Sequence, residues 1–386
     1  MYKKIFWTFK KPKKINSNSK YLTLRDINHL DRIYNKYDLK IESFDSCLVD
    51  YILNYSKFSR YIIKELDLLI KVDGKFKIKG FIINNHLGLL RSESQIKNEF
   101  SLSTNNRYIL IDECKIGKTF ELTYKKIKSI IIPEDNIHSW SFGIITNGKK
   151  KESVINLIDS IKSQNIKNYE IIICGPNFST DDKRVINIGD VHNINDIRGP
   201  ICHKKNRIIK KCKYENVAIF HDRYILPTDW FVNMKNYGNF FELLSMPNIG
   251  PFGGRVNDYT FFPAKPFQKK FKFNPLRNYN YWSDDWYSQG GVIISKKRIL
   301  LDNLLDENLY WGELEDVAFS QILNLKGYFF YFDTKNKLHT DSSRIKESKI
   351  KHGIFYLLWL NFSFFKFSFV SFKDYLMFIY EIFRKN

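Results

Sequence analysis

Three ionisable side chains follow a short apolar run near the middle of the chain. Residues 217–220 read VAIF, which fits a buried strand, and His221, Asp222 and Arg223 come directly after it. In an open α/β sheet, ligands bind in the crevice beyond the carboxyl ends of the strands. These side chains therefore either hold a ligand, such as a metal ion, or only cap the strand.

The elements before this run predict the sheet that would position it. Residues 140–148 (WSFGIITNG) and 168–175 (NYEIIICG) predict two strands. The segment between them carries apolar residues at helical spacing, namely Val154, Leu157, Ile158 and Ile161. Strand, helix and strand in this order form a βαβ unit, so we expect a parallel sheet. The basic stretch 204–216 (KKNRIIKKCKYEN) then predicts the helix that leads into the VAIF strand.

Residues 1–135 predict a separate α/β accessory domain. Apolar spacing predicts a helix over 24–37, and residues 44–83 read as a helix, a Gly-Lys turn and a strand. Residues 107–113 and 121–127 add shorter strands. This order faintly resembles the later half of a class I methyltransferase. The glycine-rich loop that a cofactor would need is absent from the sequence, so we expect a structural or docking role without a cofactor.

Composition narrows the choice of partners and compartment. The formal net charge of +21 favours an anionic partner, such as nucleic acid, anionic lipid or a phosphorylated substrate. No recognisable nucleic-acid-binding module occurs in the sequence, so we do not expect a nucleic-acid partner. The five cysteines are scattered without a CxxC pair, which suits a reducing compartment. The basic N-terminus lacks the apolar core of a signal peptide, and we expect a cytoplasmic protein.

The last segment, residues 349–386, is rich in aromatic residues. Residues 353–372 contain Lys366 as their only charge and are long enough to cross a bilayer. Because phenylalanines alternate with serine and lysine there, we expect a helical, amphipathic tail that contacts a membrane surface through residues 353–383. A helix that packs on a partner or closes the protein's own core is the alternative.

Four segments with chemical features occur in one order along the chain. Residues 141–175 form the βαβ unit, and residues 204–224 carry the basic helix, the strand and His-Asp-Arg. Residues 289–297 (QGGVIISKK) place a glycine pair before a strand, and residues 309–323 (LYWGELEDVAFSQIL) place acids at a helix start. Together they resemble the glycosyltransferases of GT-A fold, especially the family 2-like enzymes of bacterial surface-polysaccharide assembly. The resemblance implies a GT-A domain with a Rossmann-like nucleotide-binding sheet over residues 136–348.

The resemblance also implies an activity. It implies an inverting transfer of a sugar from a UDP- or GDP-linked donor to a glycan or polyprenyl-linked acceptor, assisted by Mn²⁺ or Mg²⁺ and placed at the inner face of a membrane. Asp316 corresponds to the catalytic base, and Glu315 holds the acceptor or orients the loop. The family's Asp-x-Asp motif is replaced here by His-Asp-Arg, so the choice of metal ligand stays open.

The remaining site residues carried over from the resemblance fall into three groups. The metal ligands would be Asp222, His221 and His339. The donor contacts would be Thr146, Asn147, Lys205, Arg207, Asp222 and Arg223, with Asp181 or Asp182 replacing the acid that usually holds the base. The acceptor contacts would be Gly290, Gly291, Asp284, Asp285 and Trp286.

Each assignment has a structural alternative. Acids suit the first turn of any helix, so Glu315 and Asp316 fit simple capping. His339 suits a surface loop, and Lys205 with Arg207 suits a solvated helix face. For the whole chain, the alternative is a catalytically inactive GT-A scaffold or a basic protein that binds anions or nucleic acid. A nucleotidyltransferase would need a glycine-rich phosphate loop early in the nucleotide domain, and the sequence has none there.

Overall fold

The described part of the chain contains two large sheets, of six and seven strands, and two small ones, of three and two strands. The computed structural model describes residues 4–8, 21–24, 29–56, 58–83, 90–176, 178–191, 199–256, 258–261, 278–280 and 286–340. Residues 1–345 belong to one compact unit. The predicted tail, 349–386, lies outside the described residues. No helix of the described residues is both long and apolar enough to cross a bilayer.

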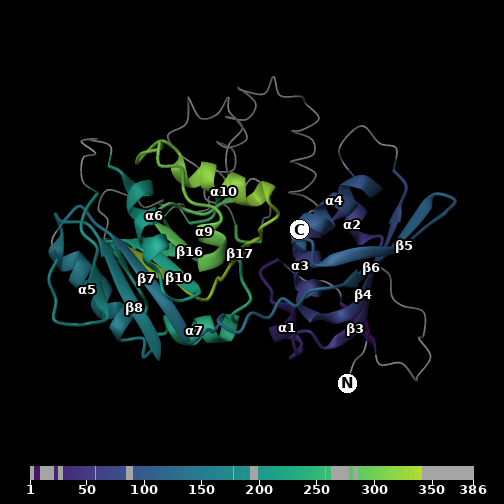
Figure 1. The fold of residues 1–386 in the computed structure, drawn as a ribbon, viewed down its shortest axis with the longest axis horizontal. Helices are drawn as coiled ribbons and strands as arrows, with labels where there is room; N and C mark the ends of the chain where they lie inside the picture. The colour runs from purple at the N-terminus through teal and green to yellow at the C-terminus, as the bar shows by residue number, and fades with distance from the viewer. Residues whose placement is uncertain are drawn as a thin grey trace. The chain divides into compact units, whose positions relative to one another are not determined.

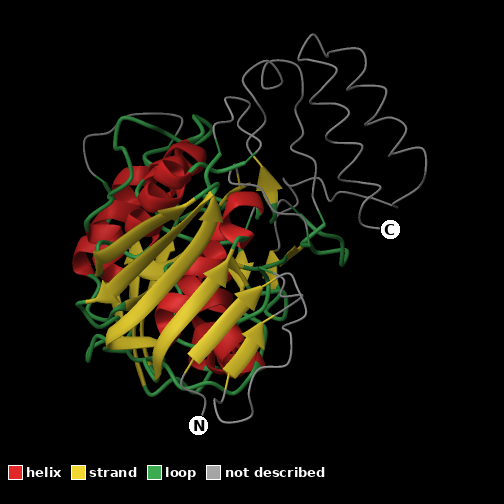
Figure 2. Ribbon diagram, turned by 90° about the vertical axis from the view of Figure 1, so that its right-hand side faces the viewer, coloured by secondary structure: helices red, strands yellow, loops and turns green. Residues whose placement is uncertain are grey.

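The first sheet is built from residues 4–126 and has the strand order β2-β1-β3-β4-β6-β5. The strands β2, β1, β3 and β4 run parallel, β6 pairs antiparallel with β4, and β5 pairs antiparallel with β6. Figure 2 looks onto these strands, with helices behind them. The strands are β1 (Lys4–Thr8), β2 (Tyr21–Leu24), β3 (Phe44–Asp50), β4 (Ile70–Phe81), β5 (Tyr108–Ile116) and β6 (Thr119–Lys126). The helices are α1 (Ile33–Lys36), α2 (Ile52–Tyr55), α3 (Ser59–Leu69) and α4 (Glu93–Ser103).

Two predictions for this region are wrong in detail. The expected helix over 24–37 is reduced, among the described residues, to α1, and Leu24 belongs to β2. The expected helix at the start of 44–83 is instead the strand β3, which pairs with both β1 and β4. Its alternating burial shows that one face points into the core, a period-2 pattern that a helical interpretation of the apolar residues overlooks.

The second sheet carries the predicted βαβ unit and has the order β17-β12-β16-β10-β7-β8-β9 (Figure 1). Strands β10, β7, β8 and β9 are parallel, whereas β16 runs antiparallel to β10 and β12. The α/β prediction is therefore confirmed. The strands are β7 (Ser139–Ile145), β8 (Asn168–Cys174), β9 (Val185–Asn187), β10 (Asn216–His221), β12 (Leu243–Ser245), β16 (Val292–Lys296) and β17 (Phe330–Phe332).

Helices cover both faces of the second sheet, which explains why every residue of β7 is buried. On one face, α7 (Trp230–Tyr237) packs Trp230 against Trp140, with ring centroids 5.0 Å apart. On the other face, α6 (Ile201–Lys211) lies so close that a side chain at Gly143 would meet Ile208 at 2.6 Å. The remaining helices among the described residues of this region are α5 (Lys151–Lys162), α9 (Lys297–Leu301) and α10 (Glu315–Leu325).

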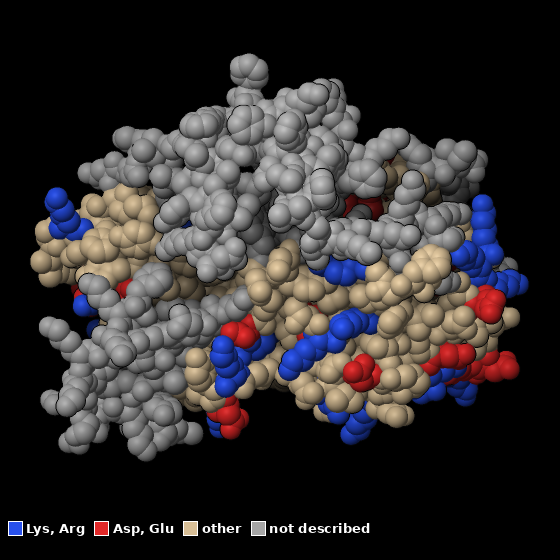
Figure 3. All heavy atoms as spheres, turned by 180° about the vertical axis from the view of Figure 1, so that it is seen from behind, with Lys and Arg blue, Asp and Glu red and all other residues tan. Residues whose placement is uncertain are grey.

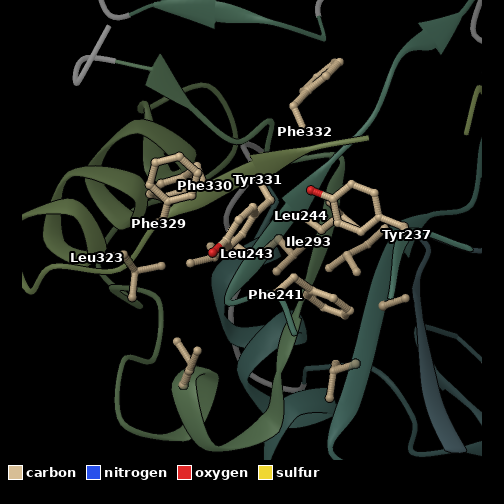
Figure 4. Close-up of a cluster of buried hydrophobic side chains, with 14 of the residues drawn as sticks. Tyr237, Phe241, Leu243, Leu244, Ile293, Leu323, Phe329, Phe330, Tyr331 and Phe332 are labelled. Carbon is tan, nitrogen blue, oxygen red and sulfur yellow. The ribbon is translucent and has the colours of Figure 1, made fainter. Parts of the chain in front are cut away.

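An aromatic cluster fills the space beside β16 and β17. Figure 4 shows side chains from the end of α7, from β12, β16 and β17, and from α10 meeting there. Buried aromatic residues of this kind dominate the energetics of a core. They fix α10, and with it the acidic start of that helix, onto the sheet. Short strands complete the fold, namely β11 (Tyr224–Ile225), β13 (Asn248–Ile249), β14 (Thr260–Phe261), β15 (Trp286–Tyr287) and β18 (Leu338–Thr340).

Candidate active site

The carboxyl ends of β7 and β10 bring two of the predicted site residues, Thr146 and Asp222, together. The parallel pairing places Ile145 opposite His221, so the residues that follow are neighbours. The backbone N–H of Asp222 donates to the Ile145 carbonyl at 3.2 Å. Thr146 Oγ1 donates to Asp222 Oδ2 at 2.6 Å and also accepts the Gly148 N–H at 3.0 Å. The Asp222 carboxylate is therefore oriented at the sheet edge.

The glycine pair lies beside the same edge because β16 is antiparallel to β10 and begins where β10 ends. The His221 N–H donates to the Gly291 carbonyl at 3.0 Å, and the Gly290 N–H donates to Asp316 Oδ2 at 2.9 Å. A Cβ atom at Gly290 would lie 2.7 Å from Glu315 Oε1. The space, rather than a special backbone angle, requires glycine at this point.

Glu315 and Asp316 are the first two residues of α10, and both lie against Gly290. Asp316 Oδ1 accepts the Val317 N–H at 2.9 Å, so Asp316 contributes to the helix start as well as to the Gly290 contact. Glu315 is buried, and burial, followed by the charge of Asp316, raises the pKa of its carboxyl while Lys205 acts in the opposite direction. Two carboxylates of unequal environment are suited to divide binding and proton transfer between them.

Adjacent residues on α6 have different tasks. Lys204 Nζ donates to the Thr146 carbonyl and pairs with Asp190 Oδ1, both at 2.7 Å, so it anchors the end of β7. Arg207 donates to the carbonyls of Ile188 and Asp190, both at 2.5 Å, and holds the segment after β9. Its predicted donor contact stays a prediction, although its guanidinium is already engaged.

Lys205 differs from both neighbours. Its side chain is 0% exposed, and within the described residues its Nζ has no hydrogen-bond partner. Burial lowers the pKa of Lys205, while Glu315 and Asp316 act to raise it. Both acids therefore act on the charge of the amine without forming a hydrogen bond to it. The sequence pointed to Lys205, and the structure brings it to the acids at the helix start.

His221 is held as a neutral base by Arg223. Arg223 Nη1 lies 3.0 Å from His221 Nδ1 and, being a permanent donor, requires Nδ1 to accept. Burial, followed by Arg223 and Lys205, puts the pKa of His221 well below its usual value. Arg223 contacts the imidazole directly, and the charge of Lys205 also disfavours its protonation.

The donor set does not fit a divalent cation. Of the three expected ligands, Asp222 supplies one carboxylate, and His221 Nδ1 is engaged by a guanidinium. His339 lies in β18 opposite Ile225, with its side chain exposed. Among the described residues, no three His, Cys, Asp or Glu side chains gather into a metal-binding group. A cation at this place would also meet the charge of Arg223.

The other predicted residues lie in varied surroundings. Asn147 Oδ1 accepts the Lys149 N–H at 3.1 Å within an exposed turn. Asp182 pairs with Lys162 at 3.0 Å, and Trp286 is buried in β15 against Phe330. The expected acceptor contacts Asp284 and Asp285 lie outside the described residues.

The residues that sequence reasoning missed are Lys204 and Tyr224. Tyr224 Oη would meet a Cβ atom at Gly291 at 2.7 Å, so this ring forms a wall beside the glycine pair. The only signal in the sequence is position, because Tyr224 directly follows His-Asp-Arg and Lys204 directly precedes Lys205.

A cavity of about 240 Å³ lies elsewhere, between the first sheet's helix α3 and the residues around β12 and β16. Its basic side chains are already paired, for example Lys64 with Glu242 at 2.6 Å and Lys296 with Asp135 at 2.6 Å. On the face drawn in Figure 3, basic and acidic side chains of the described residues are interspersed rather than gathered into one basic patch. The edge of the second sheet therefore remains the better candidate for chemistry.

No protein-family model and no curated protein matches this sequence. Solved structures that match part of this chain include S. aureus TarS 1-349, at 12% identity and a TM-score of 0.37 over 53% of this chain and 60% of that one. The same TarS piece in complex with UDP gives 14%, 0.36, 53% and 61%. GalNAc-T7 with UDP, GalNAc and Mn²⁺ gives 12%, 0.39, 53% and 43%. Each match spans less than two thirds of the other chain, and the function proposed below rests on the residues of this chain.

Proposed function

We propose that this chain is a glycosyltransferase that moves a sugar from a nucleoside-diphosphate donor to a hydroxyl of a glycan or lipid-linked acceptor, with inversion. One observation carries the proposal. The Glu315–Asp316 pair is held against the Gly290 turn at the sheet edge where Asp222 lies, and both acids act on the charge of Lys205, whose Nζ has no hydrogen-bond partner among the described residues. Acids for proton transfer and cations for phosphate are thereby in one place.

The reaction needs a base and a path for the leaving group. The acceptor oxygen forms a bond to the anomeric carbon as the bond from that carbon to the β-phosphate oxygen breaks, through a transition state of oxocarbenium character. The acceptor proton passes to the Asp316 carboxylate, and the electron pair of the broken bond leaves with the nucleoside diphosphate. Because Gly290 has no side chain, the acidic pair approaches its backbone closely, and the Gly290 N–H orients that carboxylate.

The Asp316→Asn variant tests the proposal. Because the acceptor is not needed for transfer to water, release of free sugar from a panel of UDP- and GDP-sugars is the assay, with the anomer identified by NMR. We expect wild type to release the inverted anomer from at least one donor. Asp316→Asn should lose about 10²- to 10⁴-fold of that rate, the usual contribution of general base catalysis.

The exposed Asp159 on α5 provides the matched control. Asp159→Asn makes the same chemical change away from the site and should retain full activity. Binding of UDP or GDP without release of sugar from any donor would instead favour the inactive scaffold, a protein that binds anions through Lys205. Retention of full activity by Asp316→Asn would exclude this residue as the base.

A further inference from the structure

The buried amine of Lys205 requires an explanation. Buried charges are normally paired, and a buried polar atom without a partner carries a free-energy penalty. Lys205 Nζ has no hydrogen-bond partner among the described residues although Glu315 and Asp316 are close enough to act on its charge. The amine is thus poised for a ligand that is not part of the described chain.

Arg223 provides a second cation at the same place. Its Nη1 is bound to His221 Nδ1, which fixes the plane of the guanidinium, and its buried Nε has no partner among the described residues. Its Nη2 would lie 2.8 Å from a Cβ atom at Gly291, so the guanidinium also borders the glycine pair. A fixed fork of donors with one N–H unused suits a phosphate group.

The two cations act on each other and on one shared neighbour. Arg223 works to lower the pKa of Lys205, and both residues work to lower the pKa of His221, after burial as the largest cause. The two like charges repel each other, and an anion bound by both would relieve the repulsion. A divalent cation would add to it.

We propose that Lys205 and Arg223, rather than a divalent cation, bind the diphosphate of the donor, so that the chain binds its nucleotide without metal. This rests on the proposed glycosyl transfer. As the bond to the anomeric carbon breaks, the electron pair moves onto the β-phosphate oxygen. The guanidinium and the ammonium stabilise the charge that develops there, as preorganised donors do in a water-excluded site. Asp222 then serves to hold Thr146 and the strand ends in position.

Calorimetric titration tests this assignment with three probes, namely UDP, GDP and inorganic pyrophosphate, each in EDTA and in Mn²⁺. Pyrophosphate removes any dependence on the unknown base. We expect wild type to bind pyrophosphate in EDTA, and we expect Lys205→Met and Arg223→Gln to weaken that binding at least about tenfold, since each removes a charge-assisted contact. Lys210→Met, an exposed lysine on the same helix, should bind as wild type does.

Several outcomes would overturn the assignment. Binding that needs Mn²⁺, disappears in Asp222→Ala and is unchanged in Lys205→Met would place a metal at the diphosphate. A complete lack of pyrophosphate binding would show that Lys205 and Arg223 do not form an anion site. If Lys205→Met does not fold, Arg223→Gln is the variant that tests the assignment, because the Arg223 side chain is only half-buried.

The donor assay separates this inference from the proposed function. Pyrophosphate binding through Lys205 without release of sugar from any donor would overturn the transferase and leave the anion site in place. Sugar release that requires Mn²⁺ and is unaffected by Lys205→Met and Arg223→Gln would leave the transferase in place and overturn the inference.

Discussion

Gly290 is the residue whose replacement tests the geometry of the site most directly. In Gly290→Ala the new Cβ would lie 2.7 Å from Glu315 Oε1 and 3.1 Å from Asp316 Cβ. Either the acidic pair or the glycine turn must shift, and a misplacement of about 1 Å can cost about 10²-fold in rate. We expect sugar release to fall by about that factor, with a thermal midpoint close to that of wild type. An unchanged rate would separate the acids from the reaction.

At the level of single residues, the sequence predicted the types of side chain at the site better than their directions. Asp222 and Gly290 lie at the same ends of the neighbouring strands β10 and β16, as expected, and the Gly290 N–H donates to Asp316. Lys205 was expected at the site and Lys204 was missed, because neighbours on a helix point about 100° apart and only packing decides what each of them contacts. The same packing buries Lys205 and sends Lys204 to the Thr146 carbonyl.

Among the elements, β6 depends on a buried lysine at its end. Lys126 Nζ donates to the carbonyls of Asp67 and Ile70, both at 2.8 Å, and pairs with Glu42 at 3.0 Å. Although burial works in the opposite direction, Arg107 and Lys126 hold the pKa of Asp67 below its usual value, so that carboxylate is charged. Lys126→Met should therefore lower the free energy of unfolding by about 3–5 kcal/mol, measured by urea denaturation.

The preceding residue is the control for this change. Lys125 pairs with Asp73 at 2.8 Å, but both side chains are largely exposed. Lys125→Met should therefore change the free energy of unfolding by only about 0–1 kcal/mol. Equal effects of the two substitutions would show that the burial of Lys126 does not decide its contribution.

Helical and strand periods explain which elements the sequence predicted. The βαβ unit of the second sheet has long periodic segments, and α5 and β8 occur where expected. In the first sheet, β3 was interpreted as helix because short apolar runs fit both periods. The predicted Gly-Lys turn lies inside β4, where Asp73 has a φ of 66° and the strand continues beyond it. Tertiary pairing with β3 and β6 keeps this segment extended.

At the scale of the molecule, residues before and after position 135 are joined by buried polar contacts. Tyr34 Oη donates to the Tyr237 carbonyl at 2.9 Å, and Lys64 pairs with Glu242 at 2.6 Å with both side chains largely buried. Contacts of this kind are lost together when either side unfolds. The domain boundary at 135 stays a prediction of the sequence, and the structure adds that the described parts on its two sides share one hydrophobic core.

Arg32 is the central residue of this contact. It pairs with Glu65 at 3.0 Å, donates to the Phe240 carbonyl and lies 4.4 Å from the centre of the Tyr331 ring. Arg32→Met leaves Glu65 buried without its partner, which should cost about 3–5 kcal/mol of unfolding free energy. Lys36→Met is the control, because Lys36 pairs with Asp31 at the surface. We expect it to change the free energy of unfolding by only about 0–1 kcal/mol.

Tryptophan fluorescence shows whether that loss is transmitted across the contact. Trp140 and Trp230 are buried in the second sheet's core, whereas Arg32 belongs to the first part of the chain, and Trp7→Phe in every variant removes the tryptophan of β1 in the first sheet. If the two parts unfold cooperatively, the urea midpoint seen by tryptophan fluorescence should fall in Arg32→Met by the same amount as the midpoint seen by far-ultraviolet circular dichroism. The opposite outcome is a fluorescence midpoint that stays at the wild-type value while circular dichroism shows an additional transition at lower urea concentration. That result would show that the first sheet unfolds independently. In that case the first sheet would not support the site on the second.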